Sequence, residues 1–225
     1  MNPARIPPHT RTYFAREALL PSGWQHDVRI EVAADGTFGD ITPGATPASA
    51  TVLDGAVLPG MVNLHSHAFQ RAMAGLTERG GPLTDSFWTW REVMYRFLGS
   101  LNPDDVTAIA AQLYVELLQG GFTGVVEFHY LHRDPDGALY QNPAELSLRI
   151  VEAAEQTGIG LTLLPSLYQQ GGFGAVPLHH GQRRFFLTDD TFADVVTQLL
   201  KRRAPGVQIG IAPHSLRAVT PEALR

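Results

Sequence analysis

The chain has 225 residues, a formal net charge of −5, 44% apolar residues and no cysteine, which fits one or two ordinary globular domains and excludes disulfides and thiolate metal ligands. Lys and Arg are scattered apart from a basic run at 201–203, and no apolar run has the length of a membrane span or a signal-peptide core. We therefore expect a cytoplasmic protein with no nucleic-acid and no membrane partner.

Residues 1–57 are predicted to form a small N-terminal β element. Short alternating runs at 28–32 and 51–58 are typical of strands. Segments at 33–40 and 42–50 are rich in turn residues and separate these runs.

A predicted strand at 61–67 ends on His65 and His67, near the start of a second predicted domain at 58–225. Because successive side chains of a strand point to opposite faces, the two imidazoles share one face, about 6.6 Å apart along the strand. Packed or hydrogen-bonded histidines are the ordinary alternative. The spacing at the end of an apolar strand favours two ligands of one metal ion, with zinc ahead of iron, nickel and manganese.

Strands and helices alternate along the rest of the chain. Cap residues and helical spacing predict helices at 85–99, with Asp85 or Ser86 as cap, at 102–121 after Asn102, and at 142–158 after Asn142. Apolar runs predict further strands at 122–130, 159–168 and 207–215. Thr220 and Pro221 are predicted to open another helix.

This alternation predicts an α/β fold with a parallel sheet. The glycine-rich phosphate motif of doubly wound dinucleotide folds is missing, so we predict the N-terminal portion of a (β/α)8 barrel, with about four strands. In such a barrel the active site is built at the carboxyl ends of the strands.

Polar residues follow the predicted strands at those carboxyl ends. They are His129, Tyr130, Tyr168, His214 and Arg217, beside the histidine pair. His129 and His132 fit hydrogen bonding at the rim and a functional role about equally well. His214 is a possible third metal ligand, a question that spacing alone does not decide. The remaining histidines are expected at the surface or in loops, namely His9, His26, His179 and His180.

Two other features have alternative interpretations. The aromatic residues Phe87, Trp88 and Trp90 fit a helix core better than a pocket wall. The glycine-rich loop at 169–184 fits either a mobile lid or an ordered rim.

Several stretches resemble the amidohydrolase superfamily and, within it, the formimidoylglutamate deiminases. They are "NLHSHAFQRAMAGL", "DSFWTWREVMYR", "EFHYLHRDPDG", "PAELSLRI", "GIGLTLLP", "GQRRF" and "PHSLRAVTPE". The resemblance runs from about residue 14 to the end and covers about the N-terminal half of the family's length. It implies a barrel truncated at its C-terminus, a metal held by His65 and His67 with a later His and Asp, and a proton-shuttling Glu. We expect that Asp and that Glu beyond Arg225.

The resemblance also assigns substrate contacts, to Gln70, Arg91, Tyr130, His214 and Arg217. A planar guanidinium pairs two-pronged with a carboxylate, so Arg91 and Arg217 suit a dicarboxylate, although a structural ion pair explains either arginine alone equally well.

The implied activity is hydrolytic deimination of N-formimidoyl-L-glutamate to N-formyl-L-glutamate and ammonia in histidine degradation, with one divalent ion, zinc first. We do not expect the 225 residues alone to catalyse this reaction. Two alternatives stay open: a purine or related heterocycle deaminase of the same superfamily, and a non-catalytic half barrel that binds metal or a partner chain. A homo-oligomer is a further possibility.

Overall fold

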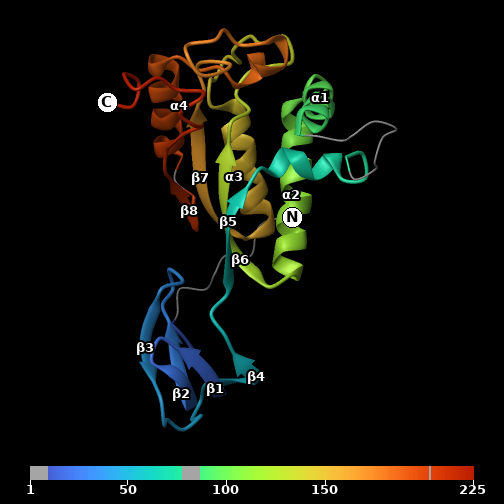
Figure 1. Ribbon diagram of the computed structural model, residues 1–225. Helices are drawn as coiled ribbons and strands as arrows, with labels where there is room; N and C mark the ends of the chain where they lie inside the picture. The colour runs from blue at the N-terminus through green and yellow to red at the C-terminus, as the bar shows by residue number, and fades with distance from the viewer. Residues whose placement is uncertain (1–9, 78–86, 203) are drawn as a thin grey trace. The chain divides into compact units, whose positions relative to one another are not determined.

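The computed structural model describes residues 10–77, 87–202 and 204–225 (Figure 1). The chain divides into two compact units, Met1–Gly60 and Met61–Arg225. The predicted caps Asp85 and Ser86 lie outside the described residues, as do His9 and the side chains of Phe87 and Trp88.

The first unit is a four-stranded sheet in the order β3-β2-β1-β4. Its strands are β1 (Arg11–Leu20), β2 (Gly23–Val32), β3 (Phe38–Thr42) and β4 (Thr51–Val57). β2 runs antiparallel to β1 and β3, whereas β4 runs parallel to β1. Ala15, Ala18, Val28 and Ile30 form its small core. The predicted β element is thus confirmed.

Two strands of this sheet were not predicted. β1 is rich in Arg, Glu, Ala and Leu, which favour helices in isolation, yet nine of its residues pair with β2. β3 was missed: it takes up residues 38–42, whereas the rest of the turn-rich segments at 33–40 and 42–50 lies in turns and irregular backbone, as predicted. Pairing with a neighbouring strand decides both cases, because strand formation depends on context more than on intrinsic preference.

The second unit contains a five-stranded sheet whose pairings are all parallel. β5 (Met61–Ser66), β6 (Phe122–His129), β7 (Gly160–Leu167) and β8 (Val207–Ile209) follow one another, and β9 (Ala212–Pro213) also pairs with β7. The single strand predicted at 207–215 is therefore wrong. Gly210 N–H donates to Leu163 O at 2.9 Å, and a side chain at Gly210 would lie 2.6 Å from the Leu164 side chain. The chain thus leaves β8 at this point before it rejoins β7.

Four α-helices are described in this unit. They are α1 (Phe87–Leu98), α2 (Pro103–Gln119), α3 (Glu145–Thr157) and α4 (Asp189–Lys201). Two short 3₁₀ helices join them, η1 (Ala68–Met73) and η2 (His180–Phe185). Helix α4 was not predicted, although Thr188 caps it through the Thr191 N–H. No helix of the described part of the chain is long and apolar enough to cross a membrane.

The helix ends confirm some predicted caps and correct others. Asn102 and Asp105 form a capping box, as expected for the start of α2. Asn142 does not cap α3: its side chain accepts the Ala144 N–H at 3.0 Å and shapes the turn before the helix. Thr220 accepts the Ala223 N–H at 3.2 Å within a turn, so the helix predicted there is wrong.

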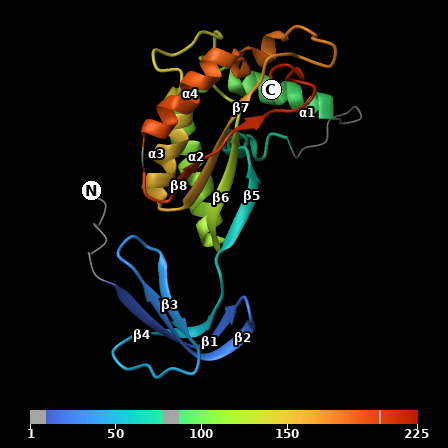
Figure 2. The ribbon, with the colours of Figure 1, turned by 90° about the vertical axis from the view of Figure 1, so that its left-hand side faces the viewer.

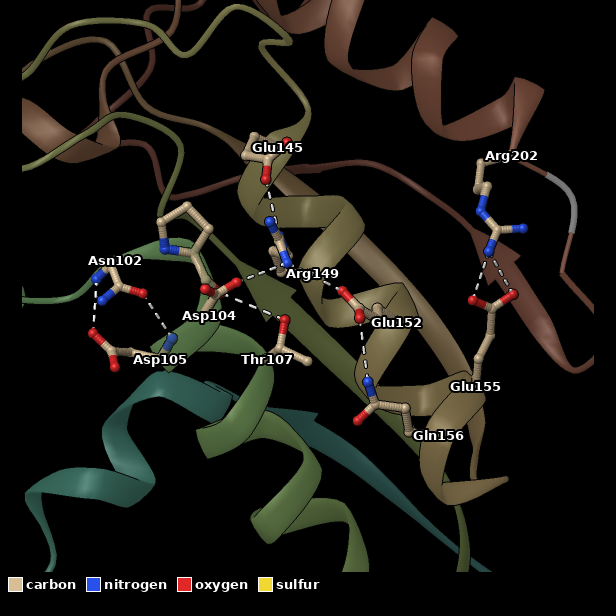
Figure 3. A network of polar contacts seen from close by, with 11 residues as sticks. Asn102, Asp104, Asp105, Thr107, Glu145, Arg149, Glu152, Glu155, Gln156 and Arg202 are labelled. Atoms are coloured by element: carbon tan, nitrogen blue, oxygen red, sulfur yellow. Dashed lines mark hydrogen bonds and ion pairs between the residues drawn. The ribbon is translucent and has the colours of Figure 1, made fainter. Parts of the chain in front are cut away.

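Helices α2, α3 and α4 pack against the sheet, and Figure 2 shows α3 and α4 beside β6, β7 and β8. Polar links cross between helices, as Figure 3 shows: Arg149 of α3 reaches Asp104 of α2 at 3.0 Å, and Arg202 pairs with Glu155 at 2.7 Å. Exposed pairs of this kind contribute little stability, so the buried apolar core carries most of it.

Candidate active site

Side chains from four strand ends meet at one edge of the sheet. His65 lies in β5 and His67 directly follows it, one residue beyond the end of the strand, while Tyr130, Tyr168 and His214 follow β6, β7 and β9. The ring centres of His67 and Tyr130 are 5.0 Å apart, those of Tyr130 and His214 5.3 Å, and those of Tyr168 and His214 4.5 Å. These rings form one continuous aromatic wall, because the carboxyl ends of parallel strands lie at the same edge.

The two imidazoles of β5 converge on one point. His65 Nε2 and His67 Nε2 are 3.1 Å apart, close to the roughly 3.3 Å between two nitrogens bound to one tetrahedral zinc ion. His67 Nδ1 lies 2.9 Å from Phe128 O. Because a carbonyl only accepts, Nδ1 carries the proton and Nε2 presents its lone pair. Burial lowers the pKa of His67, which favours the neutral form that a metal ligand needs.

A third ligand does not join this pair within the described residues, where no group of three or more His, Asp or Glu side chains could hold a metal ion. His214 is near enough for the charge of His67 to contribute to its lowered pKa, yet it does not complete such a group. A catalytic zinc ion usually takes three protein ligands. Among the described residues, His65 and His67 are thus two neighbouring imidazoles without a third candidate ligand beside them.

Glu127 and Phe128 of β6 hold the segment that carries His67. Glu127 Oε1 accepts the Ala68 N–H at 2.7 Å, and the Glu127 side chain is fully buried. Burial raises the pKa of this carboxyl group to about 7, while the bond from Ala68 acts in the opposite direction. Glu127 thus supports the backbone beside the histidine pair and does not act as a ligand in this arrangement.

Gln70 extends the aromatic wall from η1. Its Nε2 donates to Tyr130 OH at 3.0 Å. Tyr130 is buried, and burial raises the pKa of its hydroxyl group far above the usual value. The Tyr130 hydroxyl group therefore stays neutral and can take part in hydrogen bonds beside His67 and His214.

The two predicted arginines lie around Tyr95 of α1. The guanidinium carbon of Arg91 is 5.4 Å from the Tyr95 ring centre. Burial raises the pKa of Tyr95 to about 12, and the charges of Arg91 and Arg217 act in the opposite direction. Arg217 Nη1 donates to Gly171 O at 3.2 Å and to Tyr168 OH at 3.4 Å. Two guanidinium groups beside one aromatic wall suit a ligand with two carboxylates.

The other histidines differ in their surroundings. His129 shares the buried face of β6 with Val125, and burial lowers the pKa of its imidazole, while a hydrogen bond with the Leu131 backbone acts in the opposite direction. His132 Nε2 lies 2.9 Å from Ser166 O, and burial lowers its pKa to about 4. His26, His179 and His180 are exposed, as expected.

Two residues beside the candidate site, Tyr95 and Gln182, had no role in the sequence prediction, and the partners of Tyr168 were not predicted. Tyr168 was placed at a strand end, but its partners Gln182 and Arg217 are 14 and 49 positions away. No local pattern signals contacts of that range. Trp90 packs against the core, as expected for the helix interpretation.

Two family models match the chain. Residues 10–53 match the N-terminal domain of formimidoylglutamate deiminase HutF, and residues 56–225 match the amidohydrolase family. The chain belongs to the amidohydrolase family, and its fold is α/β, with an N-terminal sheet followed by roughly half of an amidohydrolase barrel.

Within that family the chain is similar to the formimidoylglutamate deiminase of Pseudomonas aeruginosa, with 54% identity over 94% of this chain and 47% of the relative. A crystal structure of an amidohydrolase from Brucella melitensis matches with a TM-score of 0.87 and 47% identity, over 95% of this chain and 48% of that one. The atrazine chlorohydrolase of Arthrobacter aurescens, complexed with zinc, shares the fold with a TM-score of 0.68 at 18% identity, over 94% of this chain and 48% of that one. The chain thus spans about half the length of these relatives.

Proposed function

We propose that this chain contributes the histidine pair and most of the substrate contacts of an enzyme that hydrolyses N-formimidoyl-L-glutamate to N-formyl-L-glutamate and ammonia. The observation that carries the proposal is the meeting of two neighbouring imidazoles with the aromatic wall that Arg217 contacts through Tyr168, while Arg91 lies over Tyr95 of α1. The 54% identity to a formimidoylglutamate deiminase supports the same substrate. The division into domains at 1–57 and 58–225, the role in histidine degradation and the cytoplasmic location stay predictions.

His65 and His67 would hold one divalent ion, with zinc as the first choice because neutral imidazole suits it. When bound, such an ion activates water for attack at neutral pH. His67 is fixed for this role by Phe128 O, and its backbone is held through the Ala68 N–H and Glu127. The family also implies a further His and an Asp as ligands and a Glu that shuttles protons. Among the described residues, no group of three or more His, Asp or Glu side chains could hold a metal ion.

The substrate contacts fall into two groups. Arg91 and Arg217 would bind the glutamate carboxylates by two-pronged hydrogen bonds. Gln70, Tyr130 and His214 would surround the formimino end, next to the histidine pair. Burial, with the nearby charge of Arg217, lowers the pKa of His214 to about 4. His214 is therefore neutral near pH 7 and does not repel a cationic formimino group.

The test is a chimera that completes residues 1–225 with the part of the Pseudomonas aeruginosa deiminase that the match does not cover. After zinc loading, ammonia release is measured with N-formimidoyl-L-glutamate, guanine and adenosine as separate substrates. We expect release from N-formimidoyl-L-glutamate alone. The same chimera with His65→Ala and His67→Ala is the control, and it should release none.

The purine alternative has a distinct outcome in this assay. Ammonia released only from guanine or adenosine would contradict the proposal and favour a heterocycle deaminase. No release from any substrate, by a chimera that folds and holds zinc, would favour the non-catalytic alternative. A ligand with two carboxylates suits two guanidinium groups better than a neutral purine ring does, because a guanidinium group pairs two-pronged with a carboxylate.

A further inference from the structure

We propose that Tyr168 and Gln182 are positioning residues for Arg217: together they orient its guanidinium group toward a substrate carboxylate. The identity of that carboxylate, one of the two of a glutamate-like ligand, rests on the proposed function. The orientation of Arg217 itself rests only on contacts within residues 168–217.

Gln182 has a defined orientation because both ends of its amide are engaged. Its side chain is buried in η2, with 2% of its surface exposed. Oε1 accepts the His179 backbone N–H at 2.9 Å. Nε2 therefore faces the opposite way, and it donates to Tyr168 OH at 2.8 Å. The backbone donor fixes which end of the amide is the oxygen, so Tyr168 receives a hydrogen bond from Gln182.

Tyr168 links Gln182 to two proposed substrate residues. Its hydroxyl oxygen accepts from Gln182 Nε2 and also from Arg217 Nη1, since arginine can only donate. Its ring lies 4.5 Å from the His214 ring, and 2% of the Tyr168 surface is exposed. Tyr168 thus contacts the arginine through its hydroxyl group and the histidine through its ring.

The loop after β7 supplies the second acceptor. Gly171 O accepts from Arg217 Nη1 at 3.2 Å, and Gln182 Nε2 lies 3.5 Å from the same oxygen. Gly171 N–H donates to Val176 O at 2.8 Å, and a side chain at Gly171 would collide with the Pro177 carbonyl oxygen. The carbonyl group therefore has a fixed place, which favours the ordered-rim interpretation of this part of the loop.

Arg217 is held by neutral acceptors. Nη1 carries two of the five N–H groups of the guanidinium, and its two acceptors are a hydroxyl and a carbonyl oxygen. No carboxylate of the described residues forms an ion pair with Arg217. The edge formed by Nε and Nη2 can pair two-pronged with a carboxylate, and no described carboxylate forms an ion pair with it beforehand. Fixing Nη1 therefore prepares Arg217 for an anionic ligand.

The orientation is tested by NMR on the 225-residue chain labelled with ¹⁵N-arginine. Restricted rotation of a guanidinium group gives separate signals for its terminal N–H groups, and Arg217→Lys assigns those of Arg217. We expect separate Arg217 signals in the wild type and averaged signals in Tyr168→Phe and Gln182→Met. Gln169→Met is the matched control, because Gln169 lies in the same loop but its side chain bonds Asp189 instead. Averaged signals in the wild type, or unchanged signals in both variants, would overturn the proposal.

The consequence for binding is tested by titrating the same samples with N-formyl-L-glutamate. We expect the wild type and Gln169→Met to bind alike, and Tyr168→Phe and Gln182→Met to bind about tenfold more weakly, the size of one charge-assisted hydrogen bond. Equal affinity in all four chains would overturn the positioning role. Separate Arg217 signals that do not respond to the ligand in the wild type would contradict the proposed function and leave the orientation of Arg217 supported.

Discussion

The histidine pair at the end of β5 and the guanidinium group of Arg217 differ in how far apart in the sequence their contacting residues lie. His65 and His67 are two positions apart where β5 ends and η1 begins, and β6 adds two contacts, from Phe128 O and Glu127. Arg217 is held by Gly171 and Tyr168, 46 and 49 positions away. The first arrangement is a local property of a strand, whereas the second exists only in the folded unit. We therefore expect changes at the pair to abolish the chemistry and changes around Arg217 to weaken binding.

The largest effect is expected from the histidine pair. His65→Ala or His67→Ala should abolish both zinc retention and turnover in the chimera, because each change removes one of few ligands. Elemental analysis after passage over a chelating resin measures the retained zinc. His26→Ala is the control, since His26 is exposed in the first unit. Unchanged zinc stoichiometry in both variants would refute the assignment of the pair.

The second prediction compares the 225-residue chain with the chimera, both of which contain the histidine pair and the two arginines. The 225-residue chain with added zinc should release ammonia at least about a hundredfold more slowly than the chimera, a difference of ~2.7 kcal/mol. The reason is that no third metal ligand joins the pair among the described residues. Turnover within about tenfold of the chimera, from a monodisperse monomer, would show that the pair is sufficient.

The third prediction concerns the arginines. In the chimera, Arg91→Met and Arg217→Met should each cost about 1.5 to 3 kcal/mol of transition-state binding, while zinc content stays the same. The measurement is kcat/KM for N-formimidoyl-L-glutamate and for analogues that lack one carboxylate. Arg96→Met is the control on the same helix, because Arg96 is exposed. Equal losses on all analogues for both variants would make the arginines structural.

The smallest effect is a dependence of stability on pH at His214. Burial lowers its pKa in the folded chain to about 4 from 6.5. Below pH 6.5 the unfolded chain therefore binds a proton that the folded chain does not, and stability falls as the pH drops toward 4. Between pH 7 and 5.5 the free energy of unfolding should fall by about 1 kcal/mol more in the wild type than in His214→Gln. Chemical unfolding at the two pH values measures this difference, and parallel losses in both chains would contradict it.

The secondary structure was predictable where its cause is local. Asn102 and Pro103 signal the start of α2, and Gly158 ends α3 with a φ of 79°. β1 was missed because its helix-favouring residues are held in a sheet by β2. The interruption at Gly210 was missed because the contacts around it, with Leu163 and Leu164, come from residues distant in the sequence.

The same distinction applies to the candidate site. Strand alternation places His65 and His67 together, and the parallel sheet brings Tyr130 and His214 beside them. The burial of His129 on the face of Val125 follows from that alternation too. In contrast, the contacts of Gln182 depend on the path of the loop between β7 and η2, which no periodic pattern reveals.

The central claim is that the histidine pair and the arginines form one site, and a single NMR measurement tests it. Co²⁺ can replace zinc at imidazole ligands, and its unpaired electrons broaden the signals of a ligand bound nearby. We predict that Co²⁺ bound to the 225-residue chain broadens the signals of N-formyl-L-glutamate. We also predict that His67→Ala and Arg217→Met each remove this effect, the first by losing the metal and the second by losing the ligand. No broadening in the wild-type chain, or broadening that persists in His67→Ala, would contradict the account.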